Sequence, residues 1–120
     1  MTVRAIRGAT QVDADDRELI LSAVAELVAA VLERNHIRAN DLISIVFTAT
    51  PDLQAEFPAY AARLAGIHDV PLLCATEIDV AGALPRVIRL LAHVETNLDR
   101  ADVRHVYLHG AAALRTDLHQ

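Results

Sequence analysis

The chain has 120 residues, of which 53% are hydrophobic and 22% charged. This composition supplies apolar material for one packed domain over residues 1–120, and it excludes a disordered linker. The net charge is −5 and all positive charge comes from eleven arginines, so we expect no nucleic-acid partner. One cysteine excludes an internal disulfide, and no apolar run reaches the roughly 18 residues of a membrane span. The start of the chain lacks a secretory signal, so we expect a cytoplasmic protein that does not bind membranes.

The first predicted element is a strand over residues 2–9 that ends at Gly8. Side chains alternate between the two faces of a strand, so Arg4 and Arg7 fall on opposite faces. The two arginines therefore cannot line the same pocket.

A long helix is predicted over residues 16–35. Asp15 followed by Glu18 fits a capping box, which predicts Asp15 as the N-cap. Apolar residues recur at helical spacing from Leu19 to Leu32 and give one broad apolar face. Such a helix packs across one face of a sheet.

The rest of the chain is predicted to be mostly strand. The predicted elements are strands over residues 43–48, 71–76, 87–96 and 103–108, with a short helix over 59–65 stopped by Gly66. Segment 87–96 fits either helix or strand, and its β-branched residues favour strand. This order predicts an α+β fold with a mixed sheet of about five strands covered by one long helix. The other sheet face is left for an oligomer to cover, and the tail from about residue 116 is expected to be loose.

No pattern typical of a nucleophile–base pair, a phosphate-binding loop, a zinc site or a dinucleotide site is present. His105 and His109 are four residues apart, but no carboxylate or cysteine motif accompanies them, so we expect no metal and no cofactor.

Arg89 is the most informative single residue, because it falls in the middle of an apolar predicted strand. A guanidinium among apolar neighbours must be paired, since burying an unpaired charge costs several kcal/mol. The partner is either Glu77 or Asp79 in a structural ion pair, or the carboxylate or phosphate of a ligand. Residue types alone leave both possibilities open.

Several different short motifs follow one another along nearly the whole chain. They are the opening Arg4-Ala5-Ile6-Arg7-Gly8-Ala9-Thr10, then Thr48-Ala49-Thr50-Pro51-Asp52-Leu53 with Phe57-Pro58-Ala59, Cys74-x-x-Glu77-x-Asp79-Val80, Arg89, and Arg104-His105-Val106-Tyr107-Leu108 with Leu114-Arg115. Together they resemble the monofunctional trimeric chorismate mutases of the small α+β barrel type, the AroH class. One departure is Tyr60, where that family often has lysine.

The resemblance implies a homotrimer forming a pseudo-α/β barrel, with active sites at the subunit interfaces and no cofactor. The implied reaction is the Claisen rearrangement of chorismate to prephenate. The implied catalytic residues are Arg89, Glu77, Cys74, Arg7 and Tyr107. The implied substrate-binding residues are Leu73, Ala75, Thr76, Phe57, Ala59, Arg63, Leu114 and Arg115.

Within this resemblance, Arg7, Arg89 and Tyr107 contact the substrate carboxylates, and Arg89 also reaches the ether oxygen. Glu77 and Cys74 bind the region of the ring hydroxyl. Two alternatives remain open at this point. One is a trimeric enamine/imine deaminase of similar fold, and the other is a non-catalytic module that binds a dicarboxylate.

Overall fold

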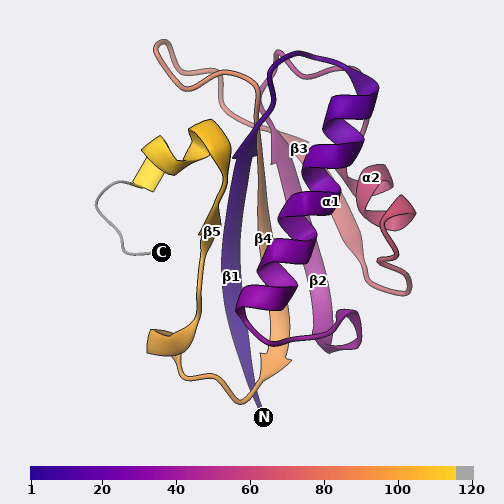
Figure 1. The fold of residues 1–120 in the computed structure, drawn as a ribbon, viewed down its shortest axis with the longest axis vertical. Helices are drawn as coiled ribbons and strands as arrows, with labels where there is room; N and C mark the ends of the chain where they lie inside the picture. The colour runs from indigo at the N-terminus through magenta and orange to yellow at the C-terminus, as the bar shows by residue number, and fades with distance from the viewer. Residues whose placement is uncertain (116–120) are drawn as a thin grey trace.

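The computed structural model describes residues 1–115, and the predicted loose tail from residue 116 lies outside this range. Within this range, one sheet contains five strands in the order β3-β2-β4-β1-β5 (Figure 1). The strands are β1 (Thr2–Gln11), β2 (Leu42–Ala49), β3 (Leu72–Thr76), β4 (Val87–Thr96) and β5 (Val106–Tyr107). β4 is antiparallel to β1 and β2, whereas β3 is parallel to β2 and β5 is parallel to β1. The predicted α+β fold with a mixed five-stranded sheet is confirmed.

The two α-helices among residues 1–115 lie on one face of this sheet (Figure 1). They are α1 (Arg17–Arg34) and α2 (Pro58–Leu64), and the short 3₁₀ helices are η1 (Ala39–Asp41), η2 (Arg100–Asp102) and η3 (His109–Arg115). α2 packs on α1 and contacts β2 and β3, so the cover is shared rather than provided by one long helix.

The hydrophobic core fills the space between α1 and the sheet. Fully buried side chains there include Ile6, Ile20, Val24, Leu27, Phe47, Ile88 and Val94. Gly8 allows α1 to approach β1 closely, because a Cβ at this position would meet Leu27 Cδ1 and Leu90 Cγ at 3.2 Å. The glycine that was predicted to end the first strand therefore serves packing instead, and β1 continues to Gln11.

The predicted N-cap is wrong by one residue. Asp16 caps α1, and its carboxylate accepts the N–H of Leu19 at 3.0 Å. Asp15 instead accepts the N–H groups of Gln54 and Ala55, both at 2.9 Å. Local sequence spacing contained no sign of this contact, because the loop before α2 reaches Asp15 only in the folded chain.

Side chains along β4 alternate between the two faces of the sheet, as predicted for residues 87–96. Ile88, Leu90, Ala92 and Val94 are buried against the helix side, whereas Arg89 and Leu91 are exposed on the other. No helix among residues 1–115 covers this second face, which we call the open face (Figure 1). β5 is shorter than the predicted segment 103–108, because only Val106 and Tyr107 pair with β1.

In the described part of the chain, no helix has both the length and the apolar character needed to cross a membrane.

Candidate active site

Strand register brings functional side chains from separate parts of the sequence into one row on the open face. Arg89 of β4 pairs with Thr48 of β2 on one side and with Ala9 of β1 on the other, and Ala9 pairs with Tyr107 of β5. In the adjacent row Arg7 pairs with Leu91. Arg7, Arg89 and Tyr107, which the sequence predicted to act together, are therefore neighbours in the sheet.

An ion pair holds one nitrogen of the Arg89 guanidinium. Its Nε donates to Glu77 Oε2 at 3.0 Å, and Thr48 Oγ1 donates to the same oxygen at 2.6 Å. Glu77 follows the end of β3, where its backbone N–H donates to the carbonyl of Ala49 at 2.9 Å. This bond extends the pairing of β3 with β2 by one residue and delivers the carboxylate to Arg89.

A cavity of about 360 Å³ opens beside this ion pair. Its lining consists of Arg7, Gly8, Ala9, Val46, Thr48, Arg89, Leu90, Leu91 and Tyr107. Among residues 1–115, neither the Arg7 guanidinium nor the Tyr107 hydroxyl has a hydrogen-bond partner, and Arg89 bonds only through Nε. The cavity therefore presents two cations and a hydroxyl, which suit an anionic ligand with carboxylate groups.

Arg89 lies in the middle of β4 and is paired, as the sequence predicted, and its side chain is 44% exposed in the single chain. β4 lies in the middle of the sheet, but the helices cover only the face opposite Arg89. The two alternatives that the sequence left open for this residue do not exclude each other. One edge of the guanidinium binds Glu77, and the terminal nitrogens remain available.

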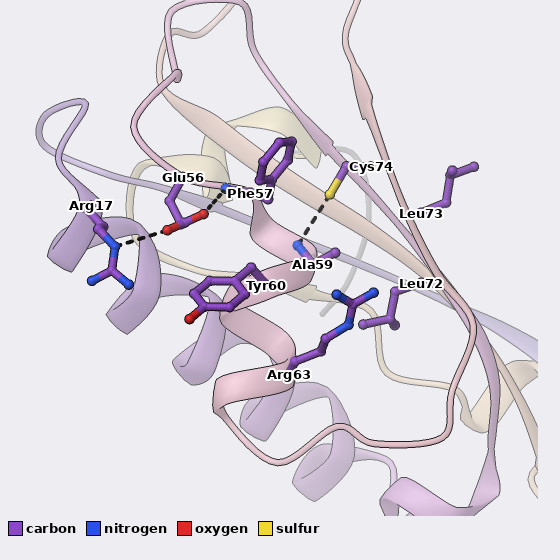
Figure 2. A pocket seen from close by; sticks show the side chains of 9 residues that line it. All are labelled: Arg17, Glu56, Phe57, Ala59, Tyr60, Arg63, Leu72, Leu73 and Cys74. Atoms are coloured by element: carbon purple, nitrogen blue, oxygen red, sulfur yellow. Dashed lines mark hydrogen bonds and ion pairs between the residues drawn. The ribbon is translucent and has the colours of Figure 1, made fainter.

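A second cavity, of about 490 Å³, lies at the outer edge of β3 beside α2 (Figure 2). Its lining consists of Arg17, Glu56, Phe57, Ala59, Tyr60, Arg63, Leu72, Leu73 and Cys74. Phe57 and Leu73 are exposed by 69% and 62%, which is high for apolar side chains. The Arg63 guanidinium has no partner among the described residues and lies near Leu72 (Figure 2).

Polar contacts fix the loop that carries Phe57 in this second cavity. Arg17 Nε donates to Glu56 Oε2 at 3.0 Å, and Glu56 Oε1 accepts the N–H of Phe57 at 2.8 Å. The hydrogen bond and charge of Glu56 raise the pKa of Arg17, so this cation stays protonated.

The predicted site residues that line cavities are thus spread over three cavities of the single chain rather than gathered in one. Cys74 lines the second cavity, and its Sγ accepts the N–H of Ala59 at 3.3 Å (Figure 2). Ala75 and Thr76 are exposed and line a third cavity, of about 300 Å³, together with Phe57.

The remaining predicted residues lie elsewhere. Leu114 is half-buried in η3, which Arg115 ends, and the side chain of Arg115 lies outside the described part of the structure. His105 Nδ1 accepts the N–H of Arg7, and His109 Nε2 lies 2.8 Å from Glu26 Oε1. Across residues 1–115, no group of three or more His, Cys, Asp or Glu side chains could hold a metal ion.

Sequence reasoning missed the hydroxyl of Thr48, although this residue stands in one of the motifs quoted above. Successive side chains of a strand point to opposite faces, so Thr48, which follows the buried Phe47 in β2, lies on the open face. Its position opposite Arg89 depends on the pairing of β2 with β4, which the alternation within one strand does not predict.

Comparison with known proteins identifies one family. A family model described as chorismate mutase type I matches residues 3–118. The chain is 50% identical over 117 residues to the chorismate mutase AroH of Thermus thermophilus, which covers 97% of this chain and 96% of that relative. It is 43% identical over 119 residues to the chorismate mutase AroH of Bacillus subtilis (strain 168), with 98% and 94% covered.

The fold agrees as well. A solved chorismate mutase from Clostridium thermocellum superimposes with a TM-score of 0.90 at 44% identity, covering 92% of this chain and 98% of that one. These findings confirm the resemblance seen in the sequence motifs and do not favour the enamine/imine deaminase alternative. The chain belongs to the type I chorismate mutase family.

Proposed function

We propose that this chain is an active chorismate mutase, an isomerase that converts chorismate to prephenate in the biosynthesis of phenylalanine and tyrosine. The observation that carries the proposal is the Arg89 guanidinium, held through Nε by Glu77 at 3.0 Å beside a cavity that Arg7 and Tyr107 also line. The terminal nitrogens of Arg89 are left for a ligand.

The chemistry suits a site built of hydrogen-bond donors. The rearrangement is pericyclic, so it requires no nucleophile and no general base. Cleavage of the ether C–O bond runs ahead of C–C bond formation and places negative charge on the ether oxygen. A rigid guanidinium that donates to this oxygen stabilises the transition state more than the ground state, which raises kcat.

The other groups at the first cavity select and orient the substrate. Arg7 and Tyr107 bind the carboxylates, because a cation and a phenol hydroxyl both donate hydrogen bonds to them. Glu77 accepts from the ring hydroxyl. Fixing both ends of the substrate selects the compact diaxial conformer, in which the reacting carbons lie close together.

We propose further that the protein is a homotrimer in which the first cavity of one protomer faces the second cavity of its neighbour. Two observations support this assembly. The open face is uncovered in the single chain and exposes apolar side chains such as Val3 and Leu91, at 56% and 37%. Arg7 and Arg89 line the first cavity whereas Phe57 and Arg63 line the second, so Phe57 and Arg63 would reach the substrate only from a neighbouring copy.

Mixing two inactive variants tests the shared site. Arg89→Ala and Arg63→Ala chains are unfolded together in equal amounts and refolded, and the activity is compared with that of each variant refolded alone. If each site takes Arg89 from one protomer and Arg63 from the next, about one third of the sites in mixed trimers, or about one quarter of all sites in a random equal mixture, regain both arginines. Failure to recover activity from mixed trimers would contradict the shared site.

Turnover itself is tested with the purified wild-type chain and chorismate, by following prephenate formation with no metal or cofactor added. Rapid formation supports the function. Binding of chorismate without conversion would instead support the non-catalytic dicarboxylate-binding module. The place of this reaction in biosynthesis supports the cytoplasm as its location.

A further inference from the structure

The hydroxyl of Thr48 lies against the Glu77–Arg89 pair on the open face. We propose that Thr48 is a positioning residue, whose hydroxyl orients the Glu77 carboxylate and through it the Arg89 guanidinium. This inference rests on the proposed function, and it adds a residue to which the family resemblance assigned no role.

The hydrogen bonds at Glu77 are unevenly divided between its two oxygens. Oε2 accepts from Thr48 Oγ1 at 2.6 Å and from Arg89 Nε at 3.0 Å, whereas Oε1 has no partner among residues 1–115. The carboxylate is therefore fixed by one oxygen and offers the other to a ligand. Without the Thr48 bond, the carboxylate could rotate and offer either oxygen to Arg89.

Two features of the fold make this orientation dependent on Thr48. Glu77 lies beyond the last residue of β3, where its side chain carboxylate is bonded only by Thr48 and Arg89 among residues 1–115. Thr48 and Arg89 are paired across β2 and β4, so these two reach the carboxylate from adjacent strands of a rigid sheet. The Glu77 side chain is only 16% exposed, so water competes weakly for the oxygens.

The role belongs to the hydroxyl and not to the shape of the side chain. Thr48 Oγ1 has no other partner in the described part of the chain. Valine has nearly the same shape and an equal preference for strands, so Thr48→Val removes the hydrogen bond and leaves the strand intact. Serine retains the hydroxyl and serves as the conservative variant.

Steady-state kinetics with chorismate test the proposal. Thr48→Val should lower kcat about tenfold, as expected for loss of a hydrogen bond to a charged group, with a smaller change in KM. Thr48→Ser should stay within about threefold of wild type, because it retains the donor. Thr10→Val is the matched control, since the Thr10 hydroxyl is buried on the helix side and has no partner in the described residues.

A double-mutant cycle then shows whether Thr48 acts through Glu77. In a Glu77→Ala background, Thr48→Val should change kcat less than about twofold, because its target is gone. Unchanged kcat in Thr48→Val, or an equal loss with and without Glu77, would overturn the proposal. A loss that Thr48→Ser fails to rescue would overturn it too. An inactive wild-type protein would instead reject the proposed function, so the two failures are distinguishable.

Discussion

Arg89→Ala should lower kcat strongly and change stability little, and the structure supplies a magnitude for each effect. The side chain is 44% exposed in the single chain, and its ion pair with Glu77 at 3.0 Å lies near the surface. Such pairs contribute about 0–1 kcal/mol to folding. Thr48 remains as a donor to Glu77 in the variant, so the carboxylate does not lose all its partners.

The catalytic loss is expected to be much larger. Removing one preorganised donor from the charge that develops in a transition state costs about 3–4 kcal/mol, or a factor of 10²–10³ in kcat. The kcat of Arg89→Lys should at best lie between those of wild type and Arg89→Ala. One ammonium group lacks the planar fork with which arginine can bind Glu77 and a ligand together.

Loss of chorismate absorbance measures turnover. Urea unfolding followed by circular dichroism measures stability, and sedimentation gives the oligomeric state. An Arg89→Ala variant that retains more than about a tenth of wild-type kcat would refute the assigned role of this residue. A variant that unfolds or dissociates would show that the ion pair is structural.

Three further predictions concern stability and are read from urea unfolding. Asn35→Ala should destabilise the fold by about 2–4 kcal/mol, because the variant loses three hydrogen bonds of a buried amide. The Asn35 amide donates to the carbonyls of Val31 and Arg104 and accepts the Arg104 N–H at 2.7 Å. A loss below about 1 kcal/mol would contradict this account. Asp16→Ala should cost about 1 kcal/mol through loss of the helix cap, and an unchanged midpoint would show that the cap is dispensable. Thr10→Val should raise stability by about 1 kcal/mol, because it removes a buried hydroxyl without a partner among residues 1–115, and destabilisation would indicate an unseen partner.

Much of the local structure could be predicted because it depends on short-range patterns. The alternation along residues 87–96 correctly identified β4 and the side of the strand that carries Arg89. Gly66, with a φ of 105°, ends α2 as predicted, because glycine adopts this backbone conformation without steric cost. The N-cap was misplaced because two adjacent aspartates compete for the role, and a distant loop engages the first of them.

The candidate site was predicted as a set of residues but not as a geometry. Motif order identified Arg7, Arg89 and Tyr107, which the sheet brings to one cavity. The resemblance assigned Cys74 and Glu77 to the same region of the substrate, and in the single chain the Cys74 thiol accepts the N–H of Ala59. Side chains three residues apart along a strand fall on opposite faces, so motif spacing did not show which cavity of the single chain each residue would line.

The amino-acid sequence by itself determined the fold class, the family and the side of β4 on which Arg89 stands, because periodicity and motif spacing are properties of the chain alone. Only the tertiary structure decided the strand order β3-β2-β4-β1-β5, which sets Thr48 beside Arg89 and lets one Glu77 oxygen accept from both. It also decided that Phe57 and Arg89 line different cavities of one chain. The physical reason is that strand pairing depends on contacts between segments far apart in the sequence, which no local pattern encodes.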